Sequence, residues 1–288
     1  MKKTLVLALA ALFALGASNI ALAEEVKPVI LVVSFGTSYN DSRDITIGAI
    51  EEDIKAQFPD YEVRRAFTSQ IIIDKLAERD GLAIDNVEGA MERLVQDGVK
   101  KLIIQPTHVM SGYEYDDVVA EVMPYKDRFD FFAIGAPLLT AFEDYERVTE
   151  ALLANNEHIA DEETAIVYMG HGTHHASNAV YSQMVNVMYS KGYENVFMGT
   201  VESFPTFDDV LAQVGAFGAK KVVIYPFMIV AGDHANNDMA GDEEDSWKTL
   251  FESAGYEVEC IIEGLGQNEG IRSIFVDHLA AAMAGAGK

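Results

Sequence analysis

The sequence predicts an α/β fold made of two pseudo-symmetric halves, each with a parallel sheet flanked by helices. Short apolar runs rich in β-branched residues alternate with longer amphipathic segments along most of the chain, which is typical of parallel strands covered by helices on both faces. In addition, residues 98–112 align without gaps on residues 218–232, and six of the fifteen positions are identical. This repeat indicates that one strand–helix arrangement occurs twice.

Four predicted strands and the helices between them make up the first half. The first helical segment begins at Asn40 or Asp41, either of which can cap it. Ile47, Ile50 and Ile54 then recur on one face, as expected for a helix that packs on a sheet. The strands predicted for this half cover residues 29–34, 62–67, 101–105 and 131–134.

The second half repeats the alternation, so that the predicted domains are residues 24–145 and residues 146–288. Cys260 lies in its last strand and is expected to be buried. As the only cysteine of the chain, it can form no intramolecular disulfide. The strands predicted for this half cover residues 165–170, 196–201, 221–226 and 257–262.

Residues 1–23 have the features of a secretory signal peptide. Two lysines precede the apolar residues 5–15, and a small-residue cleavage site ends at Ala23. The apolar stretch is too short for a membrane-spanning helix, which needs about 20 residues, and no later run reaches that length. We therefore expect a mature chain that begins at Glu24, has no membrane span and is exported to the periplasm.

The charge balance and the missing motifs exclude several classes of function. Asp and Glu number 46 against 21 Lys and Arg, which gives a formal net charge of −25. Nucleic acids and anionic lipids are bound by basic surfaces, so neither is expected as a partner. The glycine-rich motifs that bind nucleotides are missing from the sequence. A single cysteine also rules out a multi-cysteine zinc or iron–sulfur site.

Three polar side chains are predicted to meet at one edge of the second sheet. His171, Glu202 and His234 lie at or just beyond the ends of three predicted strands. The ends of parallel strands line a common crevice, where ligands bind. Two imidazoles and a carboxylate suit a borderline transition metal, and Asp233 or Asp238 can orient the ring of His234. The sequence therefore predicts a site for a divalent metal ion.

The residues around His171 indicate a surface that binds a substrate. Gly170 and Gly172 flank it, and their missing side chains allow a flat ligand to approach the backbone closely. In a second, shorter repeat, which compares residues 32–37 with residues 167–173, Phe35 corresponds to His171. The reactive group is therefore expected in the second half alone, with Phe35 as a substrate contact. His108 ends a matching strand of the first half and is either a cleft residue or a core histidine.

Five spaced motifs resemble the anaerobic cobalt chelatases of the CbiK type, and the resemblance extends from about residue 28 to the C-terminus. The motifs cover residues 34–38, 169–175, 201–205, 231–240 and 245–248. The resemblance implies a bilobal class II chelatase fold and an enzyme that inserts Co²⁺ into the tetrapyrrole sirohydrochlorin, with loss of two protons, in cobalamin synthesis. Co²⁺ is then a substrate, and no organic cofactor is implied. The implied metal-binding residues are His171, Glu202 and His234, with His171 also the proton acceptor.

Other assignments are open at this point. Related chelatases insert iron or nickel, so Fe²⁺ is an alternative metal. An exported relative is also compatible with binding and delivery of metal or of a metallotetrapyrrole such as haem, with His108 as an axial ligand. His174 and His175 are further candidate ligands, and a homo-oligomer is compatible with the sequence. Arg43 and Lys126 are candidate contacts for the substrate's carboxylates.

Overall fold

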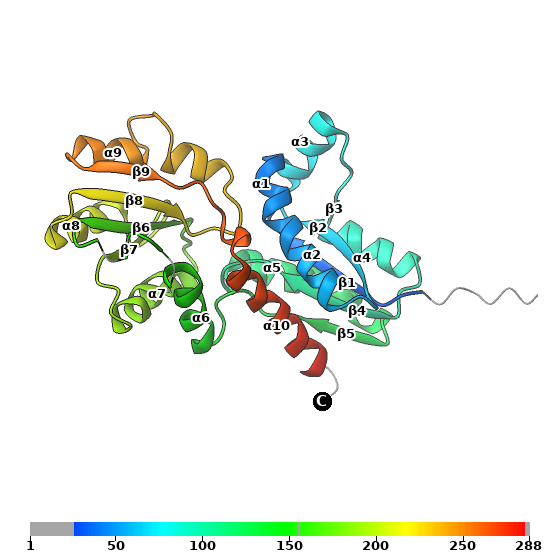
Figure 1. The fold of residues 1–288 in the computed structure, drawn as a ribbon. Helices are drawn as coiled ribbons and strands as arrows, with labels where there is room; N and C mark the ends of the chain where they lie inside the picture. Colours follow the sequence, from blue (N-terminus) through cyan, green and yellow to red (C-terminus); the bar gives the residue numbers. More distant parts are fainter. Residues whose placement is uncertain (1–25, 155, 160, 286–288) are drawn as a thin grey trace, which may run out of the picture.

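The computed structural model describes residues 26–285 except residues 155 and 160. Its helices and strands form two α/β lobes that lie side by side (Figure 1). The predicted signal peptide, residues 1–23, lies outside the described residues. In the part of the chain that is described, no helix combines the length and the apolar character needed to cross a bilayer.

The first lobe contains a five-stranded, all-parallel sheet with the strand order β3-β2-β1-β4-β5. Its helices cover both faces of this sheet. The strands are β1 (Val29–Ser34), β2 (Glu62–Phe67), β3 (Asp85–Asn86), β4 (Lys101–Pro106) and β5 (Phe131–Ile134). The helices are α1 (Asn40–Ile45), α2 (Ile47–Gln57), α3 (Gln70–Asp80), α4 (Val87–Gln96), α5 (Tyr113–Val122) and a 3₁₀ helix (Met123–Arg128).

The second lobe contains a four-stranded parallel sheet with the order β7-β6-β8-β9. The strands are β6 (Thr164–Gly170), β7 (Val196–Thr200), β8 (Lys221–Pro226) and β9 (Glu257–Cys260). The helices of this lobe are α6 (Phe142–Leu153), α7 (Ala179–Ser190), α8 (Phe207–Phe217) and α9 (Trp247–Ser253), with short 3₁₀ helices at Ala176–Asn178 and Leu265–Gln267 and a π-helical turn at Ala235–Met239. The last helix, α10 (Glu269–Gly285), returns to the first lobe.

The central strands are buried on both faces, which explains why they are apolar without interruption. In β1, Ile30 and Val32 join the hydrophobic cluster on the face covered by α2 and α10. Leu31 and Val33 join the cluster on the face covered by α4 and α5. Successive side chains of a strand point to opposite faces, so each face receives every second residue. Strand β6 shows the same alternation between α7 on one face and α8 and α9 on the other.

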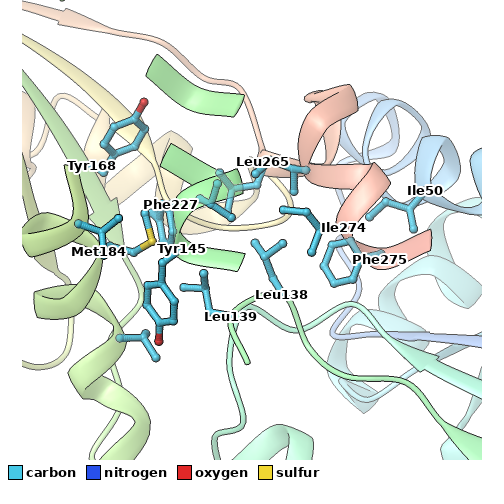
Figure 2. Close-up of a cluster of buried hydrophobic side chains, with 14 of the residues drawn as sticks. Ile50, Leu138, Leu139, Tyr145, Tyr168, Met184, Phe227, Leu265, Ile274 and Phe275 are labelled. Carbon is cyan, nitrogen blue, oxygen red and sulfur yellow. The ribbon is translucent and has the colours of Figure 1, made fainter. Parts of the chain in front are cut away.

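Two helices connect the lobes. Helix α6 follows the first sheet in sequence but packs against α7 of the second lobe, whereas α10, the last helix, packs against α6, α2 and β4. One hydrophobic cluster therefore extends from Ile50 of α2 through Phe275 of α10 and Leu138 to Met184 of α7 (Figure 2).

An ion pair supports the same contact between α10 and the first lobe. The guanidinium of Arg272 on α10 lies 2.6 Å from the carboxylate of Asp53 on α2. Arg272 also donates to the backbone oxygens of Gly266 and Gln267, at 3.2 and 2.7 Å. These contacts hold the segment that enters α10 against the first lobe.

The eight strands predicted from the sequence are all present, and the predicted parallel pairing is confirmed. The structure adds a short edge strand, β3, whose two residues are polar and carry no apolar pattern. The predicted domain boundary between residues 145 and 146 falls inside α6. Because α10 returns to the first sheet, the division of the chain at that point stays a prediction.

Replacement of Phe275 by Ala tests the role of α10. Phe275 is fully buried in the cluster shared by the lobes. We expect a loss of about 3–5 kcal/mol in the free energy of unfolding, because the substitution leaves a cavity in a packed core. Urea denaturation measures it. Phe142→Ala, at a side chain that is 56% exposed, is the matched control and should cost less than about 1 kcal/mol. Equal losses in the two variants would contradict this description of the core.

Candidate functional site

A cleft of about 510 Å³ is formed by residues of both lobes. Its walls are the segments that follow the carboxyl ends of β1, β4, β6 and β8, where ligands of parallel α/β sheets bind. The first lobe contributes residues 34–39 and 107–110 and the start of α5, and the second lobe contributes residues 171–174 and 228–234, with gaps. We refer to it as the interlobe cleft.

Backbone pairing places Glu202 beside His171. The β6–β7 hydrogen bonds continue past the strand ends, because Val201 N donates to Gly170 O at 3.0 Å and Glu202 N donates to His171 O at 2.9 Å. The Glu202 carboxylate then lies 3.8 Å from Nδ1 of His171. Both side chains line the interlobe cleft.

His234 reaches the same point from the loop after β8. It precedes the π-helical turn, and its ring lies edge to face on that of His171, with centroids 4.7 Å apart and planes at 87°. The structure thus brings together the three residues singled out in the sequence. They come from three different strand ends.

Hydrogen bonds set the tautomer of both imidazoles. Nδ1 of His171 lies 2.9 Å from Gly172 O, and Nδ1 of His234 lies 2.6 Å from the carboxylate of Asp238. A carbonyl and a carboxylate can only accept, so each Nδ1 carries the proton and each Nε2 keeps its lone pair. Metal-binding histidines in proteins commonly have this outer support. Of the two orienting carboxylates considered for His234, the structure selects Asp238.

The three side chains form an open arrangement. Across the residues that the structure describes, no three His, Cys, Asp or Glu side chains are gathered tightly enough to make a preformed metal site. The side chains of His171, Glu202 and His234 are 45%, 55% and 33% exposed. An open set of ligands leaves coordination positions for water and for a second ligand. Their role as metal ligands stays a prediction.

The two glycines beside His171 are required by packing within the second lobe. Gly172 has φ +86°, and a Cβ there would lie 2.8 Å from the side chain of Thr200. A Cβ on Gly170 would overlap the ring of Tyr181. Gly172 lines the interlobe cleft, whereas Gly170 is not among its lining residues. Packing within the second lobe therefore explains why both positions are glycine, as an alternative to the predicted approach of a substrate to the backbone.

An aromatic surface of the first lobe lines the interlobe cleft. Phe35, 47% exposed, and Tyr113, 57% exposed, both contribute to it. Exposed rings of this kind suit stacking against a flat conjugated ligand. The contact of Phe35 with a substrate stays a prediction.

His108 and Glu114 form a pair that the sequence reasoning did not recognise. The His108 ring is 8% exposed, and Nε2 lies 3.5 Å from the Glu114 carboxylate. Neither of its ring nitrogens has a hydrogen-bond partner. Burial lowers the pKa of His108 to about 4, so the ring is neutral at neutral pH. Burial also raises the pKa of Glu114.

The internal repeat contains an indication that Glu114 belongs to the site. Gly112 corresponds to Gly232, and continuing the alignment by two residues places Glu114 opposite His234. Glu114 is the second residue of α5 and lines the interlobe cleft. The first lobe therefore presents a carboxylate where the second lobe presents an imidazole.

The remaining candidates have different positions. His174 lines the interlobe cleft, whereas His175 does not and lies 3.7 Å from Asp116. Arg43 is buried and bound to Asn40 and Asp44, and Lys126 lies in the 3₁₀ helix after α5. Neither of these two basic residues lines the interlobe cleft. The described lining of the interlobe cleft contains no Lys or Arg, but a second cavity of about 480 Å³, which shares Ser38 and Tyr39 with it, is lined by Lys75 and Arg79.

Comparison with known proteins identifies the family of this chain. The family model described as cobalt chelatase (CbiK) matches residues 28–284. The chain belongs to this family. The matched residues include both lobes and every residue that lines the interlobe cleft. The resemblance of the sequence motifs to the cobalt chelatases is thus confirmed.

Two curated relatives cover most of the chain. It is 40% identical over 257 residues to the sirohydrochlorin cobaltochelatase of Salmonella typhimurium, which covers 89% of this chain and 97% of the relative. It is 34% identical over 259 residues to the sirohydrochlorin cobaltochelatase CbiKC of Nitratidesulfovibrio vulgaris, with 89% and 91% covered.

Solved structures confirm the predicted bilobal α/β fold. SirB from Bacillus subtilis with Fe³⁺ matches with a TM-score of 0.61 at 14% identity, covering 91% of this chain and 98% of that one. The sirohydrochlorin chelatase SirB from Bacillus subtilis subspecies spizizenii in complex with cobalt matches with a TM-score of 0.58 at 16% identity, with 91% and 98% covered. At such identities the likeness concerns the fold.

Asp238→Ala tests the support of His234. Without the carboxylate, Nδ1 loses its acceptor and the ring is free to change tautomer, so we expect Co²⁺ affinity to fall about 10- to 100-fold. Isothermal titration calorimetry of the metal measures it. Asp242→Ala is the matched control, because Asp242 is exposed, pairs with Lys248 at 2.8 Å and does not line the interlobe cleft. Unchanged affinity in Asp238→Ala would contradict the assigned support.

Proposed function

We propose that this chain is a sirohydrochlorin cobaltochelatase, which inserts Co²⁺ into a tetrapyrrole with release of two protons. The observation that carries the proposal is the pair of imidazoles with Nδ1 held as a donor and Nε2 left free, next to a carboxylate, in a cleft between two lobes. Membership of the CbiK family and the two curated relatives support the choice of metal and substrate.

The proposed metal-binding groups are Nε2 of His171, Nε2 of His234 and the carboxylate of Glu202. Three protein ligands hold a divalent ion while leaving positions for water and then for pyrrole nitrogens. The half-exposed side chains suit an ion that arrives and leaves during each turnover. The ion is thus a substrate that passes through the site.

The protons need acceptors besides the metal-binding atoms. Each of two pyrrole N–H bonds must break, with its electron pair left on the nitrogen that binds the metal. Nε2 of His171 can accept a proton only after it has released the metal, since one nitrogen cannot do both at once. Glu114, on the opposite wall of the interlobe cleft, is the second acceptor in this proposal. Its raised pKa makes it a better proton acceptor than an ordinary carboxylate.

Replacement of either metal-binding histidine tests the site. We expect His171→Ala and His234→Ala to remain folded and to lose Co²⁺ insertion by a factor of at least about 100, because each removes a ligand nitrogen. The absorbance change of sirohydrochlorin on metallation reports the rate. His174→Ala, at an exposed histidine of the same cleft, is the control and should retain activity. Full activity in His171→Ala or in His234→Ala would contradict the assignment of that residue as a metal ligand.

One preparation of the purified protein is enough to identify the preferred metal and to test for bound haem. Competing Fe²⁺ and Co²⁺ in the assay identify the preferred ion. An intense Soret band in the purified protein would favour carriage of haem instead of catalysis. Both ring nitrogens of His108 are buried, so axial ligation by this residue would require the cleft wall to move. Haem binding and homo-oligomer formation stay predictions of the sequence.

We also propose that the protein is exported and cleaved before Glu24. The support is the lysine pair, the apolar stretch and the small-residue cleavage site at the start of the chain. Mass spectrometry of protein isolated from the periplasmic fraction should find Glu24 as the first residue. An intact Met1 on protein from the cytoplasmic fraction would contradict export.

A further inference from the structure

The buried ring of His108 has two nitrogens without partners in a wall of the interlobe cleft. Nearly all buried polar atoms in proteins form hydrogen bonds, and an orphan costs free energy. The nearest charged group is the Glu114 carboxylate, 3.5 Å from Nε2. The two unpartnered nitrogens of His108 lower the stability of the protein and lie in the interlobe cleft, which indicates a function for this histidine.

His108 differs from the two histidines of the second lobe in one respect. The Nδ1 atoms of His171 and His234 are held as donors by Gly172 O and Asp238. Nothing holds either nitrogen of His108. No acceptor therefore holds its proton on Nδ1, and in the tautomer that carries the proton on Nε2 the ring can donate to a neighbour on that side.

Glu114 is the neighbour placed to accept from Nε2, both as a carboxylate and through the carbonyl oxygen of its protonated form. Its side chain is 52% exposed and lines the interlobe cleft, next to the buried His108. The other titratable groups that affect it are His171 and Asp117, and the buried Tyr181 hydroxyl nearby accepts a hydrogen bond from Gly172 N. His108 is the group placed to hydrogen-bond the carboxyl from the first lobe.

We propose that His108 is a positioning residue: when substrate is bound, its 3.5 Å contact with Glu114 shortens to a hydrogen bond that serves Glu114 in both of its protonation states. This inference rests on the proposed function. While Glu114 is a carboxylate, Nε2–H of His108 donates to it. When a pyrrole N–H bond breaks, the proton passes to one Glu114 oxygen and the electron pair stays on the pyrrole nitrogen. Nε2–H of His108 then donates to the other Glu114 oxygen, which still accepts as the carbonyl of the protonated acid.

The test separates this role from a purely structural one. In His108→Phe, a ring of similar shape replaces two orphaned nitrogens, so the melting temperature should stay the same or rise. We expect kcat to fall about 10- to 100-fold, as for loss of outer support at a reactive group. KM for sirohydrochlorin and Co²⁺ affinity should change less than about 2-fold, since His108 contacts neither in this proposal. A lower melting temperature with unchanged kcat would overturn it.

Two further variants keep the test decisive. His108→Gln places an amide near the position of Nε2 and should recover part of kcat, even if the Phe variant folds poorly. His108→Phe combined with Glu114→Gln should be no slower than the slower single variant, because the two residues act as one unit. Multiplying losses would contradict the pairing.

His158→Phe provides the matched control. Its side chain is 16% exposed and lies outside the interlobe cleft, so this variant should keep its full kcat. Wild-type protein without turnover would refute the proposed function itself. Wild-type turnover with an unaffected His108→Phe variant would refute only the inference about His108.

Discussion

The chemistry of the site depends on one constraint, the placement of a proton on Nδ1 of His171 and of His234. Gly172 O and the Asp238 carboxylate each accept from these nitrogens. If either ring adopted the other tautomer, its Nε2 would carry the proton and could bind no metal. Glu202 adds a carboxylate to the two imidazoles of the proposed metal site. The open arrangement suits an ion that must be released to a macrocycle, whereas a closed site would retain it.

The fold supplies this constraint through backbone pairing and packing. Continued β6–β7 hydrogen bonds place Glu202 beside His171. Gly170 and Gly172 make room for Tyr181 and Thr200 behind the histidine. The helix exchange between lobes, with α6 on the second and α10 on the first, joins the lobes through one hydrophobic cluster. The two walls of the interlobe cleft therefore face each other across a packed connection, with the proposed metal-binding groups on one wall and aromatic rings and Glu114 on the other.

Much of the fold could be predicted because its strands are buried on both faces and are therefore uninterrupted apolar runs. The convergence of His171, Glu202 and His234 followed from parallel topology, since all three come after strand ends. The edge strand β3 has only polar residues and leaves no such pattern. The return of α10 to the first sheet could not be predicted, because it depends on contacts between residues far apart in the sequence and leaves no local pattern.

The His108–Glu114 pair was missed for a similar reason. Helix α5 begins with three acidic residues within its first five, Glu114, Asp116 and Asp117, which sequence patterns assign to a solvated helix start. Only the position of the two lobes shows that Glu114 lines the interlobe cleft next to a buried histidine. In the sequence, the indication that Glu114 belongs to the site is its alignment with His234 in the internal repeat.

The most direct measurement is anomalous diffraction at the cobalt edge from crystals of the protein soaked in Co²⁺. We expect one cobalt ion in the interlobe cleft, bonded to Nε2 of both His171 and His234 at about 2.0–2.1 Å, the length of zinc–imidazole bonds in proteins, with Glu202 as the oxygen ligand. Cobalt bound through either Nδ1, or bound elsewhere with these two histidines free, would contradict it.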